Sequence, residues 1–177
     1  MAFWMGGLSH HVLKRKVTIG FGGIPNVIQH LVTFVVPEKH ATATFEALTG
    51  YMPADFSRFY SYDPATRILS HLSDDRKEQP LPVIFATPDG EYAMGVYSPH
   101  SSALRGGGYG RWRFQAERVV KWNCVYRSAN ILPGAYSTEC YSVIGSLEDV
   151  KSAMSRLHDH FARSVQTILN MAPASPL

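Results

Sequence analysis

Polar side chains recur at every second position in three short runs of the sequence, GRWRFQ, VVKWNCVYR and ECYSVIG. Side chains two residues apart lie on the same face of an extended strand, so each run predicts a polar face opposite an apolar one. If the three strands are neighbours, these faces combine into one polar surface. Its members are Arg111, Arg113, Lys121, Asn123, Arg127, Glu139 and Tyr141.

Such a surface has the chemistry needed to hold a sugar, or another small hydroxyl-rich or anionic ligand. Arginine, asparagine and glutamate side chains can bind hydroxyl groups, while tyrosine rings can stack on the apolar side of a sugar ring. The residues predicted to bind a ligand are Arg111, Arg113, Lys121, Asn123, Tyr141 and Tyr109. The alternative is an ordinary solvent-facing side of an antiparallel sheet.

Acid–base chemistry would need a carboxylate and a histidine that face each other across a pocket. The candidate catalytic residues are Glu46, His100 and Glu139, and His100 belongs to a glycine-rich loop predicted over 98–110. Each of the three could equally be structural or solvated. A small sugar-processing enzyme is therefore an alternative to a binding protein.

The sequence lacks the motifs for dinucleotide or phosphate binding, for serine hydrolase chemistry and for zinc binding. The segment GFGGIP at Gly20 has Pro25 where the dinucleotide fingerprint needs its third glycine, and GGGYG lacks the ending of a phosphate-binding loop. No G-x-S-x-G motif is present. The eight histidines show no zinc-binding spacing, so we expect neither a metal nor a cofactor.

Composition and charge argue against two classes of partner, nucleic acid and the membrane interior. The net charge of +3 is spread along the chain, without the dense basic stripe typical of nucleic-acid binders. No apolar run approaches the roughly 20 residues of a membrane span. The start of the chain is apolar first and basic second, the reverse of an export signal, which slightly favours a cytoplasmic location. Cys124 and Cys140 are expected to be small buried residues, with a disulfide as the alternative.

The elements that position these residues are mainly strands. Short β-branched and aromatic runs separated by turn residues predict an antiparallel β-sandwich over 17–145, after an N-terminal extension over 1–16. Helical spacing and an N-cap at Ser146 predict one amphipathic helix over 146–172 that packs on the sheet. We expect its residues Leu157, Phe161 and Val165 to be buried.

The alternation on either side of the Ile131–Gly134 turn region predicts that Val119–Arg127 and Glu139–Gly145 are adjacent antiparallel strands. In that pairing Trp122 belongs to the core, and Cys124 lies opposite Cys140.

Three segments, TFEALTGYMPADFSRFYSYDP, QPLPVIFATPDGEYAMGVYSP and RVVKWNCVYR, resemble uncharacterised bacterial β-sandwich proteins. These in turn resemble the galactose mutarotase-like supersandwich, of which this chain would be a shortened member. The resemblance implies a carbohydrate-related role. Mutarotase-type enzymes pair a glutamate base with histidines, but no residue here matches those positions, so binding is favoured over catalysis. A structural or interaction module that self-associates is a further alternative.

Overall fold

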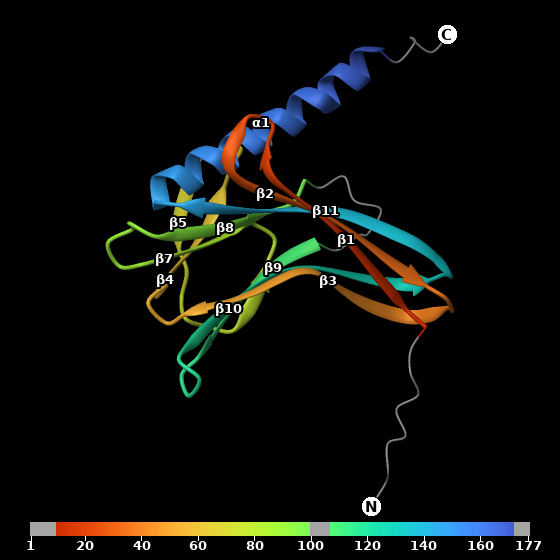
Figure 1. Ribbon diagram of the computed structural model, residues 1–177, viewed down its shortest axis with the longest axis horizontal. Helices are drawn as coiled ribbons and strands as arrows, with labels where there is room; N and C mark the ends of the chain where they lie inside the picture. The colour runs from red at the N-terminus through yellow and green to blue at the C-terminus, as the bar shows by residue number, and fades with distance from the viewer. Residues whose placement is uncertain (1–9, 100–106, 172–177) are drawn as a thin grey trace, which may run out of the picture.

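The chain forms two antiparallel β-sheets and one C-terminal helix, which confirms the predicted β-sandwich. We describe the protein from a computed structural model, over residues 10–99 and 107–171. The two sheets and the helix are stacked as three layers (Figure 1), with the larger sheet in the middle. We call the larger sheet A and the smaller sheet B.

Sheet A has seven strands in the order β1-β2-β11-β8-β7-β4-β5. Sheet B has four, in the order β3-β10-β9-β6. The strands of sheet A are β1 (Val12–Phe21), β2 (Ile24–Val36), β4 (Arg58–Asp63), β5 (Ile68–His71), β7 (Val83–Ala86), β8 (Ala93–Tyr97) and β11 (Gly134–Gly145). Those of sheet B are β3 (His40–Pro53), β6 (Lys77–Gln79), β9 (Gly107–Phe114) and β10 (Val119–Ile131).

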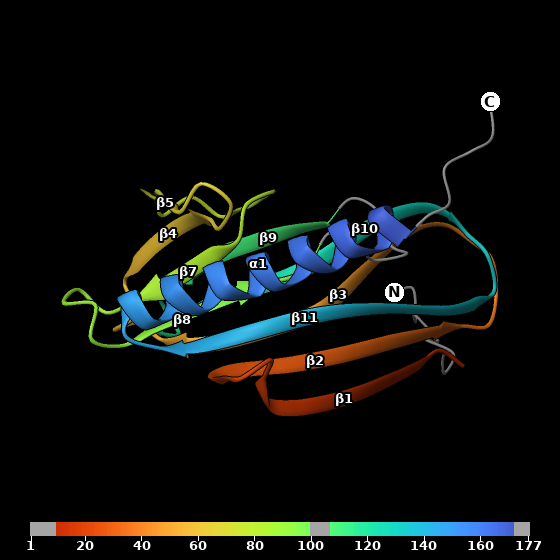
Figure 2. The ribbon, with the colours of Figure 1, turned by 90° about the horizontal axis from the view of Figure 1, so that it is seen from above.

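Helix α1 (Leu147–Met171) lies across the outer face of sheet A, over β8 and β11 (Figure 2). It begins with a reciprocal cap: the Asp149 N–H donates to Ser146 Oγ, and the Ser146 N–H donates to the Asp149 carboxylate. Leu157 is buried as predicted, whereas Phe161 is only partly buried. The side chain of Val165 lies outside the described part of the structure. Within the described residues, no helix has the length and hydropathy that crossing a membrane requires.

Two apolar cores hold the layers together, and sheet A contributes to both. Strand β7 is buried along its whole length because its alternate side chains enter different cores. Val83 and Phe85 face sheet B, whereas Ile84 and Ala86 face the helix. A strand buried on both sides reads as a continuous apolar run, which is what its sequence VIFA shows.

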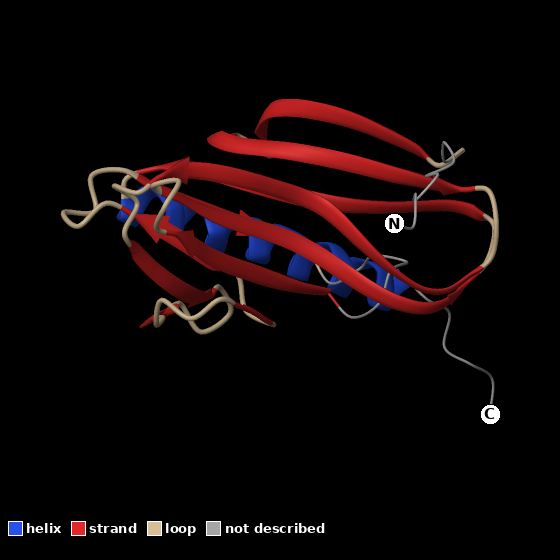
Figure 3. Cartoon of the chain, turned by 90° about the horizontal axis from the view of Figure 1, so that it is seen from below, coloured by secondary structure: helices blue, strands red, loops and turns tan. Residues whose placement is uncertain are grey.

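The predicted pairing of Val119–Arg127 with Glu139–Gly145 is wrong. Strand β10 pairs with β3 and β9 in sheet B, while β11 pairs with β2 and β8 in sheet A. The turn after Ile131 therefore carries the chain from one sheet to the other instead of closing a hairpin. Seen from below, the strands lie in front of the helix, which is on the far side of the sheets (Figure 3). Trp122 does lie in the core, at 5% exposure. Strand β1 begins at Val12, so part of the predicted N-terminal extension belongs to sheet A.

Candidate functional site

The outward side of sheet B, facing away from sheet A, collects the polar groups that the sequence predicts for β10. Val120, Trp122, Cys124 and Tyr126 point into the core between the sheets. The alternate residues Lys121, Asn123, Val125 and Arg127 therefore point outward, as predicted. The register brings their outward neighbours beside them, from β3, β9 and β6. We call this surface the outer face of sheet B.

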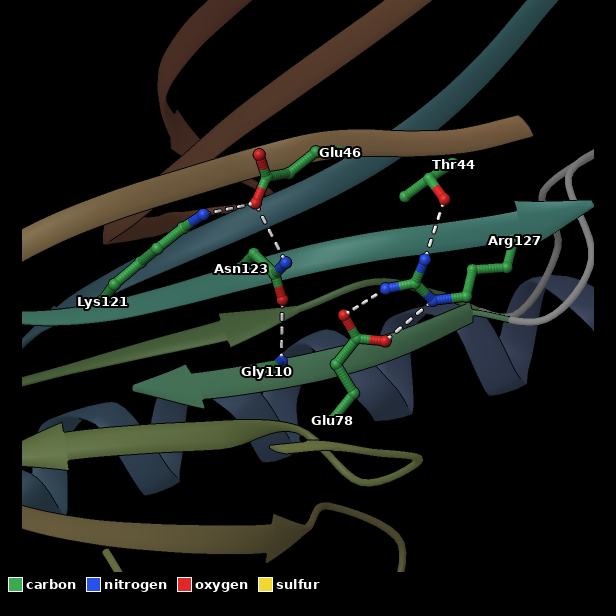
Figure 4. A network of polar contacts seen from close by, with 7 residues as sticks. All are labelled: Thr44, Glu46, Glu78, Gly110, Lys121, Asn123 and Arg127. Atoms are coloured by element: carbon green, nitrogen blue, oxygen red, sulfur yellow. Dashed lines mark hydrogen bonds and ion pairs between the residues drawn. The ribbon is translucent and has the colours of Figure 1, made fainter. Parts of the chain in front are cut away.

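Glu46 and Asn123 are the centre of a polar network on the outer face of sheet B (Figure 4). Lys121 Nζ lies 2.9 Å from Glu46 Oε1, and Asn123 Nδ2 donates to the same oxygen over 3.0 Å. The other end of the Asn123 amide accepts a hydrogen bond from the Gly110 backbone N–H at 2.8 Å. Asn123 is 4% exposed, so these bonds fix the orientation of its amide.

Arg127 extends the polar network over all four strands of sheet B. Its guanidinium binds both carboxylate oxygens of Glu78 on β6, at 3.0 and 2.6 Å, and donates to Thr44 Oγ1 on β3 at 2.8 Å (Figure 4). The strand between β10 and β6 is β9, whose outward positions here are Gly108 and Gly110. Because neither glycine carries a side chain, Arg127 can reach Glu78 across β9.

Three aromatic side chains lie at the other end of the outer face of sheet B. Tyr51 and Trp112 flank Lys121 as its register partners on β3 and β9, and Phe114 is the next outward residue of β9. Lys121 Nζ lies 5.2 Å from the Trp112 ring centroid and 5.7 Å from that of Tyr51. Tyr51 is 62% exposed. The aromatic end and the polar network are thus connected through Lys121.

Gly110 is what allows the Trp112 ring to lie against the sheet. A Cβ atom at Gly110 would come within 2.0 Å of Trp112 Cη2 and 2.6 Å of Asn123 Oδ1. Any side chain here would displace the indole ring and break the amide contact. The outer face of sheet B therefore depends on glycine at this position.

The electrostatics of Glu46 favour its charged form. Burial raises the pKa of this carboxyl, but hydrogen bonds from Lys121 and Asn123 oppose burial and hold the pKa below its ordinary value. An ionised carboxylate that already accepts two donors is suited to orienting its neighbours. It is poorly suited to giving a proton to a leaving group near neutral pH.

Arg111 and Arg113 do not share the face of Lys121 and Asn123, so this part of the predicted surface is wrong. Arg111 pairs with Trp122 and Arg113 with Val120, and both partners point into the core. Arg111 donates to Ser73 O at 2.9 Å and to Gln79 Oε1 at 3.1 Å, and is 1% exposed. Ser73 lies in the segment that joins β5 to β6, and Gln79 is the last residue of β6, so the arginine anchors this connection between the sheets.

Arg113 is held in the same region. Its guanidinium donates to Ser57 O at 2.8 Å and to Asp74 Oδ1 at 3.1 Å, and lies 4.8 Å from the Phe59 ring centroid. The two arginines are thus bound to backbone and side-chain acceptors of the fold, and neither faces outward from sheet B.

The remaining predicted residues are dispersed. Tyr109 is buried between the sheets, where its hydroxyl accepts from the Ser98 N–H at 2.9 Å, so it does not face outward. Glu139 and Tyr141 lie in sheet A, where the Tyr141 hydroxyl and Gln29 Nε2 both donate to the Glu139 carboxylate. Tyr141 belongs to the core under helix α1. His100 lies outside the described residues. Glu46 and Glu139 thus occupy different sheets.

Sequence reasoning missed the aromatic contribution of Tyr51, Trp112 and Phe114, and the ion-pair partner Glu78. The alternation in GRWRFQ placed Trp112 and Phe114 together, but their apolar character suggested that they faced the core. Only the register between β9 and β10 reveals that they face outward. In the described ranges 10–99 and 107–171, no three His, Cys, Asp or Glu side chains are grouped as a metal site.

Comparison with known proteins adds no relative to this picture. No protein-family model matches the sequence, and no curated protein is significantly similar to it. The function must therefore be argued from the geometry itself.

Proposed function

We propose that the protein binds carbohydrate without transforming it, through the outer face of sheet B. The observation that carries this proposal is the arrangement of Tyr51, Trp112 and Phe114 beside the network of Glu46, Asn123 and Arg127. Aromatic rings provide an apolar surface for one side of a sugar ring. The exposed members of the network, Glu46 and Arg127, provide oriented donors and acceptors for its hydroxyl groups, while the buried Asn123 amide holds Glu46 in place.

The charge balance of this face supports a neutral ligand. Lys121 is paired with Glu46, and Arg127 is paired with Glu78, so these two cations of the polar network each have a carboxylate partner. At the aromatic end, Arg76 lies 5.2 Å from the Phe114 ring centroid and donates to Arg113 O. An anionic ligand would have to compete with these carboxylates. A neutral, hydroxyl-rich ligand can bond to the same groups while both ion pairs stay intact.

The arrangement of the carboxylates supports binding over catalysis. Hydrolysis of a glycosidic bond uses two carboxyl groups on either side of the bond, and one of them acts as a proton donor. On the outer face of sheet B, Glu46 and Glu78 are each bound to a cationic side chain. Glu139 belongs to the other sheet.

The test is binding of the wild-type protein to a broad panel of neutral mono- and oligosaccharides, by saturation-transfer NMR followed by calorimetry. Tyr51→Ala and Trp112→Ala should each weaken binding about two- to thirteenfold, since an aromatic contact contributes about 0.5–1.5 kcal/mol.

The matched control is Tyr92→Ala, which removes a tyrosine that is 64% exposed in the loop between β7 and β8. It should leave affinity unchanged. Absence of binding to the whole panel would contradict the proposal, and so would an equal loss in all three variants.

A further inference from the structure

The two cysteines of the sequence face each other between the sheets. Cys124 points inward from β10 and Cys140 points inward from β11, and their sulfur atoms lie 3.4 Å apart. Both are free thiols, at 2% and 0% exposure. Because β10 and β11 belong to different sheets, a bond between these atoms would join sheet A to sheet B.

Hydroxyl groups surround this dithiol in a core that is otherwise apolar. The Tyr126 hydroxyl lies 4.0 Å from Cys140 Sγ and 2.6 Å from Ser98 Oγ. Ser98 is in turn held by the Tyr109 hydroxyl, which accepts its backbone N–H at 2.9 Å. A thiolate is better stabilised beside such donors than among hydrocarbon side chains alone.

The two thiols are not equivalent. The hydrogen bond between the two thiols is the main cause that holds the pKa of Cys140 below its ordinary value. Burial raises this pKa, and the Tyr126 and Ser98 hydroxyls lower it. The same sulfur–sulfur contact, together with burial, raises the pKa of Cys124. Cys140 is therefore the better nucleophile of the pair, because the thiolate is the reactive form.

We propose that Cys124 and Cys140 form a modification site, a buried dithiol that a small hydroperoxide converts into a disulfide between the two sheets. The Cys140 thiol loses its proton, its thiolate attacks a peroxide oxygen, and the O–O bond breaks to give a sulfenic acid. The departing hydroxide takes up the proton that Cys140 lost and leaves as water. The Cys124 thiol then attacks that sulfur and releases the second water. Two thiols and one hydrogen peroxide thus give one disulfide and two waters.

The geometry favours closure within one molecule. A disulfide bond is about 2.05 Å long, so the sulfur atoms must approach from 3.4 Å by little more than 1 Å. The chain has only these two cysteines, so no other internal pairing competes. The oxidant must be small because both thiols are buried and a large molecule could not reach them.

The experiment treats the reduced, folded full-length protein with hydrogen peroxide and follows its mass and its thiol content under denaturing conditions. We expect the loss of two hydrogen atoms, and both thiols should become unreactive. Tryptic cleavage after Arg127 separates the two cysteines, so the peptides 122–127 and 128–151 should appear as one linked species that a reductant divides.

Cys140→Ala and Cys124→Ala serve as controls that cannot close the bond. Each should gain oxygen or remain unchanged, without the loss of two hydrogens. If either variant fails to fold, the wild-type peptide map still decides the question. The proposal is overturned if both thiols persist in peroxide that fully oxidises glutathione added to the same sample. It is also overturned if the only disulfide found joins two separate chains.

Discussion

At the scale of single residues, Arg111 looks like a ligand-binding group in the sequence but has a structural role. Its guanidinium has three acceptors: Ser73 O, Ser73 Oγ and Gln79 Oε1. A buried arginine is stable only where such partners are available. Here they come from the segment that leaves sheet A after β5 and enters sheet B as β6.

Arg111→Ala is therefore expected to lower the free energy of unfolding by about 2–4 kcal/mol, because it removes hydrogen bonds from a charged donor, each worth about 1.5–3 kcal/mol, and the packing of a buried side chain. Urea unfolding measures this change. The control is Arg58→Ala in β4, an exposed position where the cost should stay below about 0.5 kcal/mol. Equal effects at both positions would contradict the structural role of Arg111.

At the scale of elements, strand alternation predicted which residues of one strand share a face, and this held for Lys121, Asn123 and Arg127. It did not predict how the faces of different strands combine. That depends on register, and a shift of one residue moves every side chain of a strand to the other side. In β9 both faces carry plausible core or surface residues, so the pairing of Arg111 with Trp122 is not encoded in the alternation.

The same limit explains the wrong pairing of β10 with β11. A short turn between two alternating runs predicts a hairpin, but β3 and β9 already pair with the two edges of β10. The final helix was predicted more closely because its cap and its apolar spacing are local signals, contained in neighbouring residues.

The docking of helix α1 depends on Gly95 in β8. A Cβ atom at this position would lie 2.6 Å from Met154 Sδ and 2.8 Å from Val150 Cγ1, both on the helix. Gly95→Ala should therefore destabilise the protein by about 1–3 kcal/mol through overpacking, as measured by urea unfolding.

Gly134→Ala is the matched control for this effect. A Cβ there would meet only Tyr136, at 3.9 Å, so the variant should be neutral or slightly more stable. Similar destabilisation in both variants would show that backbone preference, not helix docking, determines the result at Gly95.

At the scale of the whole molecule, the two cores are joined through the strands of sheet A that are buried on both sides. Strand β7 sends Phe85 towards sheet B and Ile84 towards helix α1. Neither core can be lost without exposing the opposite face of the same strand. The three layers should therefore unfold as one unit.

Leu157→Ala tests this coupling from the helix side. Removing this buried side chain should cost about 2–5 kcal/mol. The urea transition should move equally whether it is followed by far-UV circular dichroism or by tryptophan fluorescence, since Trp122 reports on the other core. A helix signal that shifts while the fluorescence transition stays fixed would show that the layers unfold separately.

The position of β11 has a consequence for how the chain can fold as it is synthesised. This late strand lies between β2 and β8, so β2 has no partner on that side until residues 134–145 have left the ribosome. Strand β3 likewise has no partner in sheet B until β10 has been synthesised. During most of translation the nascent chain therefore presents long unpaired strand edges, which invite pairing with other chains. Yield on expression should consequently depend on translation speed and on chaperones that cover those edges.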